Sequence, residues 1–131
     1  YEGVKFVLIA PDELRLPDYI KHDECDANGL EYVQVNTLEE AMPMVDVLYM
    51  TRVQQERFTD LVEYEKVKNT YTLHNSMLDG SKDNLRILHP LPRVNEISED
   101  VDDNPKAYYF EQARNGVYAR QAVICDILGL V

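Results

Sequence analysis

Two short segments of the sequence contain residue types that can bind a small anionic substrate. The first is residues 51–57, Thr-Arg-Val-Gln-Gln-Glu-Arg. The guanidinium of Arg52 can hold a carboxylate through two parallel hydrogen bonds, which the point charge of a lysine cannot do. Gln54 adds a neutral donor and acceptor two residues later. Glu56 is well placed to orient Arg52 or Arg57. A solvated loop would also explain this segment, and the segment alone does not decide between the two.

The second segment is residues 89–93, His-Pro-Leu-Pro-Arg. Two prolines on either side of Leu91 restrict the backbone and remove two N–H donors. The resulting rigid turn, with exposed carbonyl oxygens, is suited to accepting hydrogen bonds from a small amide or amine. The alternative is a simple strand terminator. His89 can be explained by packing in the core with a satisfied ring nitrogen, and we do not expect it to act as a general base.

Common cofactor and nucleophile motifs are absent from the sequence. It contains no GxGxxG loop, no GxxxxGK[ST] loop and no GxSxG elbow. The histidines His22, His74 and His89 are too far apart in sequence to suggest a zinc site. Cys25 and Cys125 share no metal-ligand spacing, and we expect reduced cytoplasmic thiols rather than a disulfide. We therefore predict neither a metal ion nor an organic cofactor.

Composition restricts the class of protein further. The 131 residues, 45% of them hydrophobic, suit one ordered domain. No apolar run approaches the roughly 18 residues that cross a membrane. The formal net charge of −11 argues against nucleic acid and anionic membrane surfaces as partners. An anionic substrate would therefore need locally placed arginines. Because the chain begins Tyr-Glu-Gly rather than with Met, we interpret it as a fragment.

Short apolar runs alternate with polar, helix-compatible segments along the chain. We expect strands over residues 4–10, 32–35, 45–50 and 85–88. We expect helices over residues 17–28, 37–41, 59–67 and 106–128, with Thr37 as an N-cap, a break near residues 115–116 and Gly129 as a stop. This order predicts a doubly wound, three-layer αβα domain with a mostly parallel, Rossmann-like sheet. Ligands of such folds lie outside the carboxyl ends of the strands, which here are residues 11–12 and the two segments described above.

Several stretches together resemble the aspartate carbamoyltransferase family. They are residues 6–12, 46–54, 89–93 and 115–121, in the family's order and at its approximate separations over nearly the whole chain. Ornithine carbamoyltransferases carry a cysteine in the turn that corresponds to residues 89–92, which disfavours that paralogue. The resemblance identifies residues 1–131 as the C-terminal, aspartate-binding domain of a carbamoyltransferase.

The resemblance implies transfer of a carbamoyl group from carbamoyl phosphate to L-aspartate, in cytoplasmic pyrimidine biosynthesis. By position, Arg52 would bind an aspartate carboxylate with Gln54 beside it. The backbone carbonyls of Pro90 and Leu91 would hold the carbamoyl amino group. Glu56 would orient Arg52. Further arginines would be structural or domain-bridging, namely Arg57, Arg93 and Arg120.

The resemblance also implies partners outside these residues. The family's oxyanion and phosphate groups lie in an N-terminal carbamoyl phosphate domain with a Ser-Thr-Arg-Thr motif, and a neighbouring subunit of a homotrimer adds a lysine loop. We therefore expect the chain alone to be inactive, and a regulatory chain remains open. Asn95 departs from bacterial relatives, which often have aspartate there, so a charged contact of their conformational switch would be altered or lost.

A central strand and helix that open the family's domain are also missing here. In the doubly wound order, the four remaining strands would form two pairs flanking a gap. Unpaired buried backbone is costly, so we expect the chain not to fold stably alone. Two other functions stay open: a non-catalytic binding module of the same fold, and a carbamoyltransferase that uses another amine such as ornithine.

Overall fold

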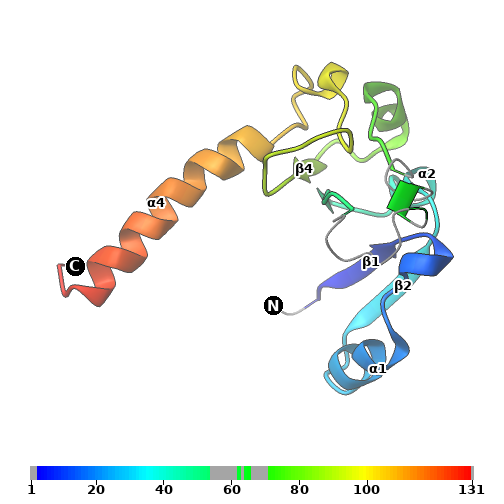
Figure 1. The fold of residues 1–131 in the computed structure, drawn as a ribbon, viewed down its shortest axis with the longest axis horizontal. Coiled ribbons are helices and arrows are strands. Elements are labelled where there is room, and N and C mark those ends of the chain that lie inside the picture. The colour runs from blue at the N-terminus through cyan, green and yellow to red at the C-terminus, as the bar shows by residue number, and fades with distance from the viewer. Residues whose placement is uncertain (1–2, 54–61, 63, 66–70, 131) are drawn as a thin grey trace.

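The computed structural model describes residues 3–53, 62, 64, 65 and 71–130. All four expected strands are present; β2 is one residue longer than predicted, and the other three are shorter. They are β1 (Lys5–Ile9), β2 (Glu31–Val35), β3 (Val47–Tyr49) and β4 (Arg86–Leu88). The expected helix over residues 59–67 lies almost entirely outside the described residues. Figure 1 shows the arrangement of the elements.

The strands form two separate parallel pairs in the described part of the chain. Strand β1 pairs with β2, with Phe6 opposite Tyr32, and β3 pairs with β4, with Leu48 opposite Ile87. The α/β class and the parallel pairing are thus confirmed, and the strands pair as the interrupted doubly wound order predicts. The outer edge of β4 is covered, because the backbone of Ile87 bonds to Lys106 and Tyr108.

The first helical region differs from the expected α-helix over residues 17–28. It begins as a single turn, α1 (Asp18–Ile20), and continues as a π-helix, η2 (Lys21–Asp26). The region ends in a Schellman motif: Gly29 takes φ 64°, and the N–H groups of Gly29 and Leu30 bond to the carbonyls of Asp26 and Cys25. This segment also buries Cys25.

Short helices connect the remaining elements. Helix α2 (Leu38–Ala41) begins at the expected cap, where the Thr37 hydroxyl accepts the N–H of Glu40 at 3.2 Å. Among the described residues, three 3₁₀ helices were not predicted: η1 (Asp12–Leu14), η4 (Asn75–Gly80) and η5 (Glu99–Val101).

Helix α4 (Tyr109–Ile127) runs without a break through residues 115–116, so the predicted interruption is wrong. Gly116 is tolerated inside the helix, where the guanidinium of Arg120 donates to its carbonyl oxygen at 3.0 Å. The predicted stop is confirmed, because Gly129 takes φ 65°. The N–H groups of Gly129 and Leu130 then bond to the carbonyls of Asp126 and Cys125, which is a Schellman ending.

The hydrophobic core lies around the second strand pair. It joins α2, β3 and β4 to the segments before and after β4, and its members are Leu38, Met42, Leu48, Met50, Leu73, Leu78, Leu85, Ile87, Ile97, Val101 and Tyr109. Ile9 of β1 packs against this core only at its edge, whereas Phe6 is 42% exposed. The core therefore fixes β3, β4 and the loops at their ends more firmly than it fixes β1.

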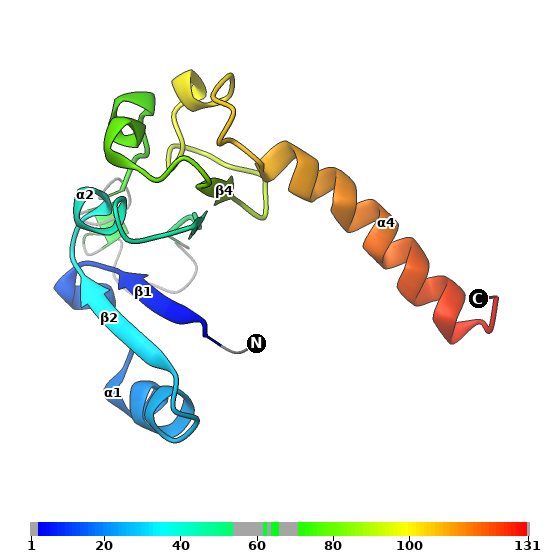
Figure 2. The ribbon, with the colours of Figure 1, turned by 180° about the vertical axis from the view of Figure 1, so that it is seen from behind.

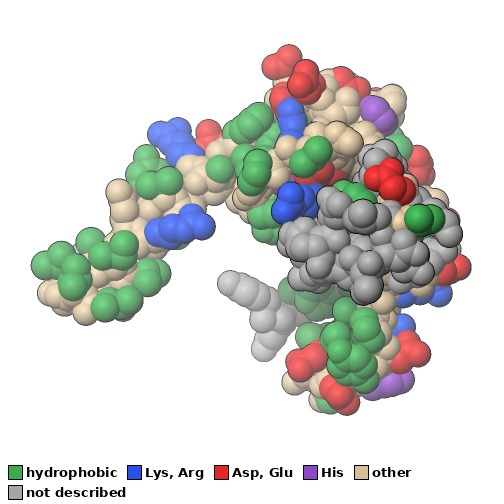
Figure 3. Space-filling model, in the orientation of Figure 1, with side chains coloured by type: hydrophobic (Ala, Val, Ile, Leu, Met, Phe, Trp, Pro, Cys, Tyr) green, Lys and Arg blue, Asp and Glu red, His purple; other side chains and the backbone are tan. Residues whose placement is uncertain are grey.

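Helix α4 packs on this core only at its start and then projects away from it (Figures 1 and 2). Tyr109 in its first turn is fully buried. Beyond that turn, apolar side chains are exposed along the helix and its end, as the space-filling view shows (Figure 3). They are Val117, Tyr118, Val123, Ile124, Ile127, Leu128 and Leu130.

Candidate functional site

An open cavity of about 830 Å³ lies at the carboxyl ends of the strands. Residues 9–11 line it after β1, residues 50–53 after β3 and residues 89–92 after β4. Parallel strands end at one edge of a sheet, so segments far apart in the sequence meet there. The structure therefore brings Arg52, Pro90 and Leu91 together at one cavity.

The first predicted segment is described only in part. Arg52 is exposed and lines the cavity. The proposed roles of Gln54, Glu56 and Arg57 stay predictions, because these residues lie outside the described part of the chain.

The second predicted segment forms a tight turn after β4. Leu91 has φ 49°, in the left-handed region, and the Leu91–Pro92 peptide bond is cis. Within the described residues, the carbonyl oxygens of Pro90 and Leu91 accept no hydrogen bond. Both residues line the cavity. The turn thus has two carbonyl groups available to an N–H donor in the cavity.

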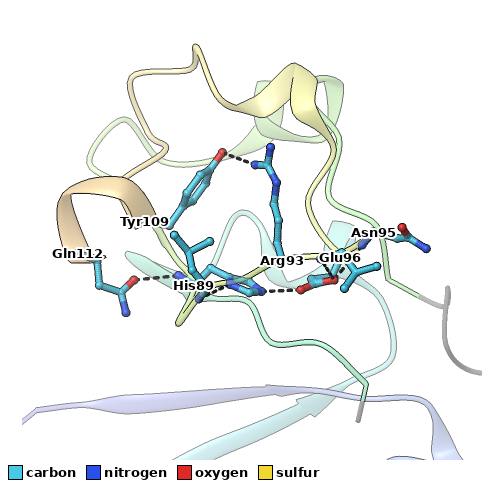
Figure 4. Close-up of polar contacts among 8 residues, drawn as sticks. His89, Arg93, Asn95, Glu96, Tyr109 and Gln112 are labelled. Atoms are coloured by element: carbon cyan, nitrogen blue, oxygen red, sulfur yellow. Dashed lines mark hydrogen bonds and ion pairs between the residues drawn. The ribbon is translucent and has the colours of Figure 1, made fainter. Parts of the chain in front are cut away.

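His89 and Glu96 form a buried hydrogen-bonded pair beneath this turn (Figure 4). The two residues are 2% and 7% exposed, and Nε2 of His89 lies 2.7 Å from Oε1 of Glu96. Nδ1 of His89 accepts the N–H of Leu91 at 2.8 Å. Both ring nitrogens are thus engaged inside the core, which leaves His89 no free nitrogen to act as a base in this arrangement.

The carboxylate of Glu96 is held from its other side by backbone amides. Its Oε2 accepts the N–H groups of Val94 and Asn95 at 3.1 and 3.0 Å. Burial alone would raise the pKa of the Glu96 carboxyl, but the backbone amides of Glu96 itself and Val94, together with His89, outweigh it and hold the pKa below its ordinary value. Sequence reasoning missed Glu96, since its spacing of seven residues from His89 carries no local signal.

Arg93, at the end of the turn, does not line the cavity and bonds to Tyr109 at the start of α4 (Figure 4). Its guanidinium makes a two-fold pair with the carboxylate of Asp102, with Nη2 and Oδ2 2.6 Å apart. Nη1 donates to the Tyr109 hydroxyl at 3.2 Å, and that hydroxyl in turn donates to Asp102. This cluster joins the loop after β4 to α4, an arrangement that favours the structural role predicted for Arg93.

The same cluster shifts the ionisation of its members. The hydrogen-bonded Arg93 guanidinium holds the pKa of the Asp102 carboxyl below its usual range, and the carboxylate raises the pKa of Arg93. Burial, followed by the bond to Asp102, raises the pKa of Tyr109 to about 12. Arg120, in contrast, is exposed on α4 and bonds to a carbonyl of its own helix, so its predicted bridging role stays a prediction.

The site therefore combines one guanidinium with two available carbonyl oxygens in a partly apolar cavity. Such a set can bind a carboxylate at one end and an amide at the other. In the part of the chain that the structure describes, no three His, Cys, Asp or Glu side chains gather as a metal site. Cys25 and Cys125 are both free. None of the described helices is long and apolar enough to span a membrane.

Comparison with known proteins decides the family. The family model of the aspartate/ornithine carbamoyltransferase Asp/Orn binding domain matches residues 1–127. The chain belongs to the aspartate/ornithine carbamoyltransferase family. The resemblance read from residues 46–54 and 89–93 is thus confirmed.

Individual members of this carbamoyltransferase family support the same assignment. The aspartate carbamoyltransferase catalytic subunit of Parabacteroides distasonis is 62% identical over 126 residues, covering 95% of this chain and 41% of its own length. The catalytic subunit of M. jannaschii aspartate transcarbamoylase has a TM-score of 0.86 at 40% identity, over all of this chain and 43% of that one.

A third relative is a structure with ligands bound. Trypanosoma cruzi aspartate transcarbamoylase, solved in complex with carbamoyl phosphate and aspartate, has a TM-score of 0.80 at 34% identity, over 92% of this chain and 40% of that chain. The chain thus spans about two fifths of the length of the relatives that it matches, as the 41% and 43% coverage shows.

Proposed function

We propose that residues 1–131 are the aspartate-binding part of a longer aspartate carbamoyltransferase catalytic subunit. The observation that carries this proposal is the meeting of Arg52 with the open carbonyls of Pro90 and Leu91 at one cavity. The names of the relatives support aspartate rather than ornithine as the acceptor. The reaction would convert carbamoyl phosphate and L-aspartate to N-carbamoyl-L-aspartate and phosphate, in cytoplasmic pyrimidine biosynthesis.

The proposed chemistry assigns a distinct part to each group. Arg52, with Gln54 beside it and Glu56 orienting it, binds a carboxylate of aspartate against the unfavourable net charge of −11. The carbamoyl amino group has two N–H donors, which match the two carbonyls of Pro90 and Leu91. The aspartate nitrogen then attacks the carbamoyl carbon, a C–N bond forms, the C–O bond to phosphate breaks and a proton leaves the nitrogen. Holding both reactants in this geometry lowers the entropic part of the barrier.

Groups that stabilise the oxyanion and the departing phosphate are not supplied by the described residues in this scheme. We assign them to an N-terminal carbamoyl phosphate domain and to a neighbouring subunit of a homotrimer, with a regulatory chain as a further partner left open. Residues 1–131 alone are then a substrate-binding part without activity. No metal ion or organic cofactor enters this scheme.

The test is an Arg52→Ala variant of the full-length catalytic subunit. Loss of a charge-assisted partner for a carboxylate should raise the KM for aspartate about 10- to 100-fold. Arg114→Ala is the matched control, because Arg114 is exposed on α4 with its guanidinium 3.9 Å from Glu111. Unchanged aspartate kinetics in Arg52→Ala would refute the assignment of Arg52.

The same assay separates the other functions. Faster transfer to ornithine than to aspartate would make the protein an ornithine enzyme. A full-length protein that binds aspartate but transfers no carbamoyl group to either amine would be a binding module.

A further inference from the structure

We propose that His89 and Glu96 are positioning residues, which hold the turn at Leu91 so that the carbonyls of Pro90 and Leu91 face the carbamoyl group. This inference deepens the proposed function and rests on it. Neither side chain would touch the substrate. Each would act through a chain of hydrogen bonds that runs from Glu96 through the imidazole to the backbone of Leu91.

The turn needs such support because of the conformation of Leu91. Its φ of 49° lies in the left-handed region, which is unfavourable for a residue with a side chain. A conformation of this kind persists only where its surroundings hold it. The N–H of Leu91 donates to Nδ1 of His89 at 2.8 Å. This bond holds the Pro90–Leu91 peptide group, which carries the Pro90 carbonyl and precedes the Leu91 carbonyl.

The bond to Leu91 requires one particular tautomer of His89. Nδ1 can accept an N–H only when it carries no proton, so the proton must sit on Nε2. Nε2 faces Oε1 of Glu96 at 2.7 Å, and an ionised carboxylate can only accept. Glu96 therefore selects the tautomer that serves Leu91. The burial of both side chains protects this arrangement from competing water.

The backbone of His89 makes a separate connection to α4 and to the end of β3. The backbone N–H of His89 donates to Oε1 of Gln112 on α4 at 2.9 Å. Nε2 of Gln112 donates in turn to the hydroxyl of Tyr49 at the end of β3, at 3.3 Å. The backbone of His89 is thus connected, through Gln112, to the end of the strand that precedes Arg52.

A Glu96→Gln substitution in the full-length catalytic subunit tests this logic at nearly constant size. If the new amide turns its NH₂ to His89, the imidazole must move its proton to Nδ1, which then opposes the N–H of Leu91. If the NH₂ turns the other way, it opposes the backbone amides that Glu96 accepts. Either orientation breaks a bond of the chain.

The expected result is a fall in kcat with little change in aspartate binding. Because a misplacement of about 1 Å can cost about 100-fold in rate, kcat should fall about 10- to 100-fold. The KM for aspartate should stay within about threefold, since the substitution leaves in place the bonds from the His89 N–H to Gln112 and from Gln112 to Tyr49. Glu99→Gln is the matched control, an exposed glutamate in η5 that should leave kcat unchanged.

A second pair of variants tests the acceptor on His89 directly. In His89→Asn the side-chain oxygen can still accept the N–H of Leu91, whereas His89→Leu fills a similar volume with no acceptor. If the histidine positions the turn, His89→Asn should keep a kcat about fivefold higher than that of His89→Leu, as expected for one retained hydrogen bond. If His89 is only a packed core residue, the kcat of His89→Leu should equal or exceed that of His89→Asn.

The outcomes separate this inference from the proposed function. A wild-type protein that does not carbamoylate aspartate refutes the proposed function, and with it the basis of this inference. An active wild type with Glu96→Gln equal to Glu99→Gln, or with His89→Leu equal to His89→Asn, overturns the positioning roles alone. Melting curves of each variant check folding, and loss of folding in all three buried variants would assign the pair a purely structural role and also overturn the proposal.

Discussion

At the residue scale, neighbouring residues of the segment 89–93 have different roles. Pro90 and Leu91 line the cavity, whereas Arg93, two residues later, pairs with Asp102 after η5 and with Tyr109 at the start of α4. An arginine in a substrate-binding motif is therefore not necessarily a substrate ligand. The role of Arg93 depends on the partner of its guanidinium. That partner, Asp102, lies nine residues away in a different loop.

The Asp102 carboxylate should make stability depend on acid. Its folded pKa lies below the ordinary value of 3.8, so the unfolded chain takes up the proton first as the pH falls. The stabilisation is complete above about pH 5 and is lost as the pH falls through the depressed folded pKa. Melting of the full-length protein from pH 7 downward should show Asp102→Asn less stable than wild type near neutrality, with the difference shrinking in acid.

Asp103→Asn is the control for this acid dependence, because Asp103 is the exposed neighbour of Asp102. It should melt like wild type throughout the pH range. A constant difference between Asp102→Asn and wild type at every pH would contradict the assignment of the acid effect to this carboxylate.

At the element scale, the sequence predicted the ends of helices correctly but predicted a helix break that is not there. The Thr37 cap and the Gly129 ending both appear as predicted. The expected break at residues 115–116 does not appear, because a glycine in a long helix costs only about 1 kcal/mol and the surrounding helix offsets it. The π-helical winding over Lys21–Asp26 had no signal in the sequence.

The cap of α2 can be tested by removing its hydroxyl. Thr37→Ala should lower the free energy of unfolding of the full-length protein by about 1 kcal/mol, since the N–H of Glu40 loses its acceptor. Thr37→Ser keeps the oxygen and should recover most of the loss. Chemical denaturation measures both, and equal destabilisation by the two substitutions would show that the methyl group, not the cap, matters.

At the scale of the whole molecule, the two strand pairs leave edges that the described residues do not join. Unpaired strand edges and exposed apolar helix surface both favour association with other chains. The apolar side chains along the outer part of α4 add to this tendency. The substrate-binding end is nevertheless well supported, because its turn is anchored in the core around β3 and β4.

We therefore expect residues 1–131 not to form a stable monomer by themselves. The isolated chain should melt broadly or elute as larger species, whereas the full-length subunit should melt cooperatively. Circular dichroism and light scattering measure the two properties. A soluble 131-residue monomer with a sharp melt would contradict this expectation.

Sequence alone determined the family, the four strands, the Thr37 cap, the Gly129 ending and the two segments that line the cavity. Each of these depends on local residue types or on motifs that are contiguous in the chain. Only the tertiary structure decided that Arg52 meets Pro90 and Leu91 at one cavity, that Arg93 pairs with Asp102, and that Glu96 lies against Nε2 of His89. The physical reason is that these contacts join residues with no common periodicity, and only the packing of the strands and their loops brings them within bonding distance.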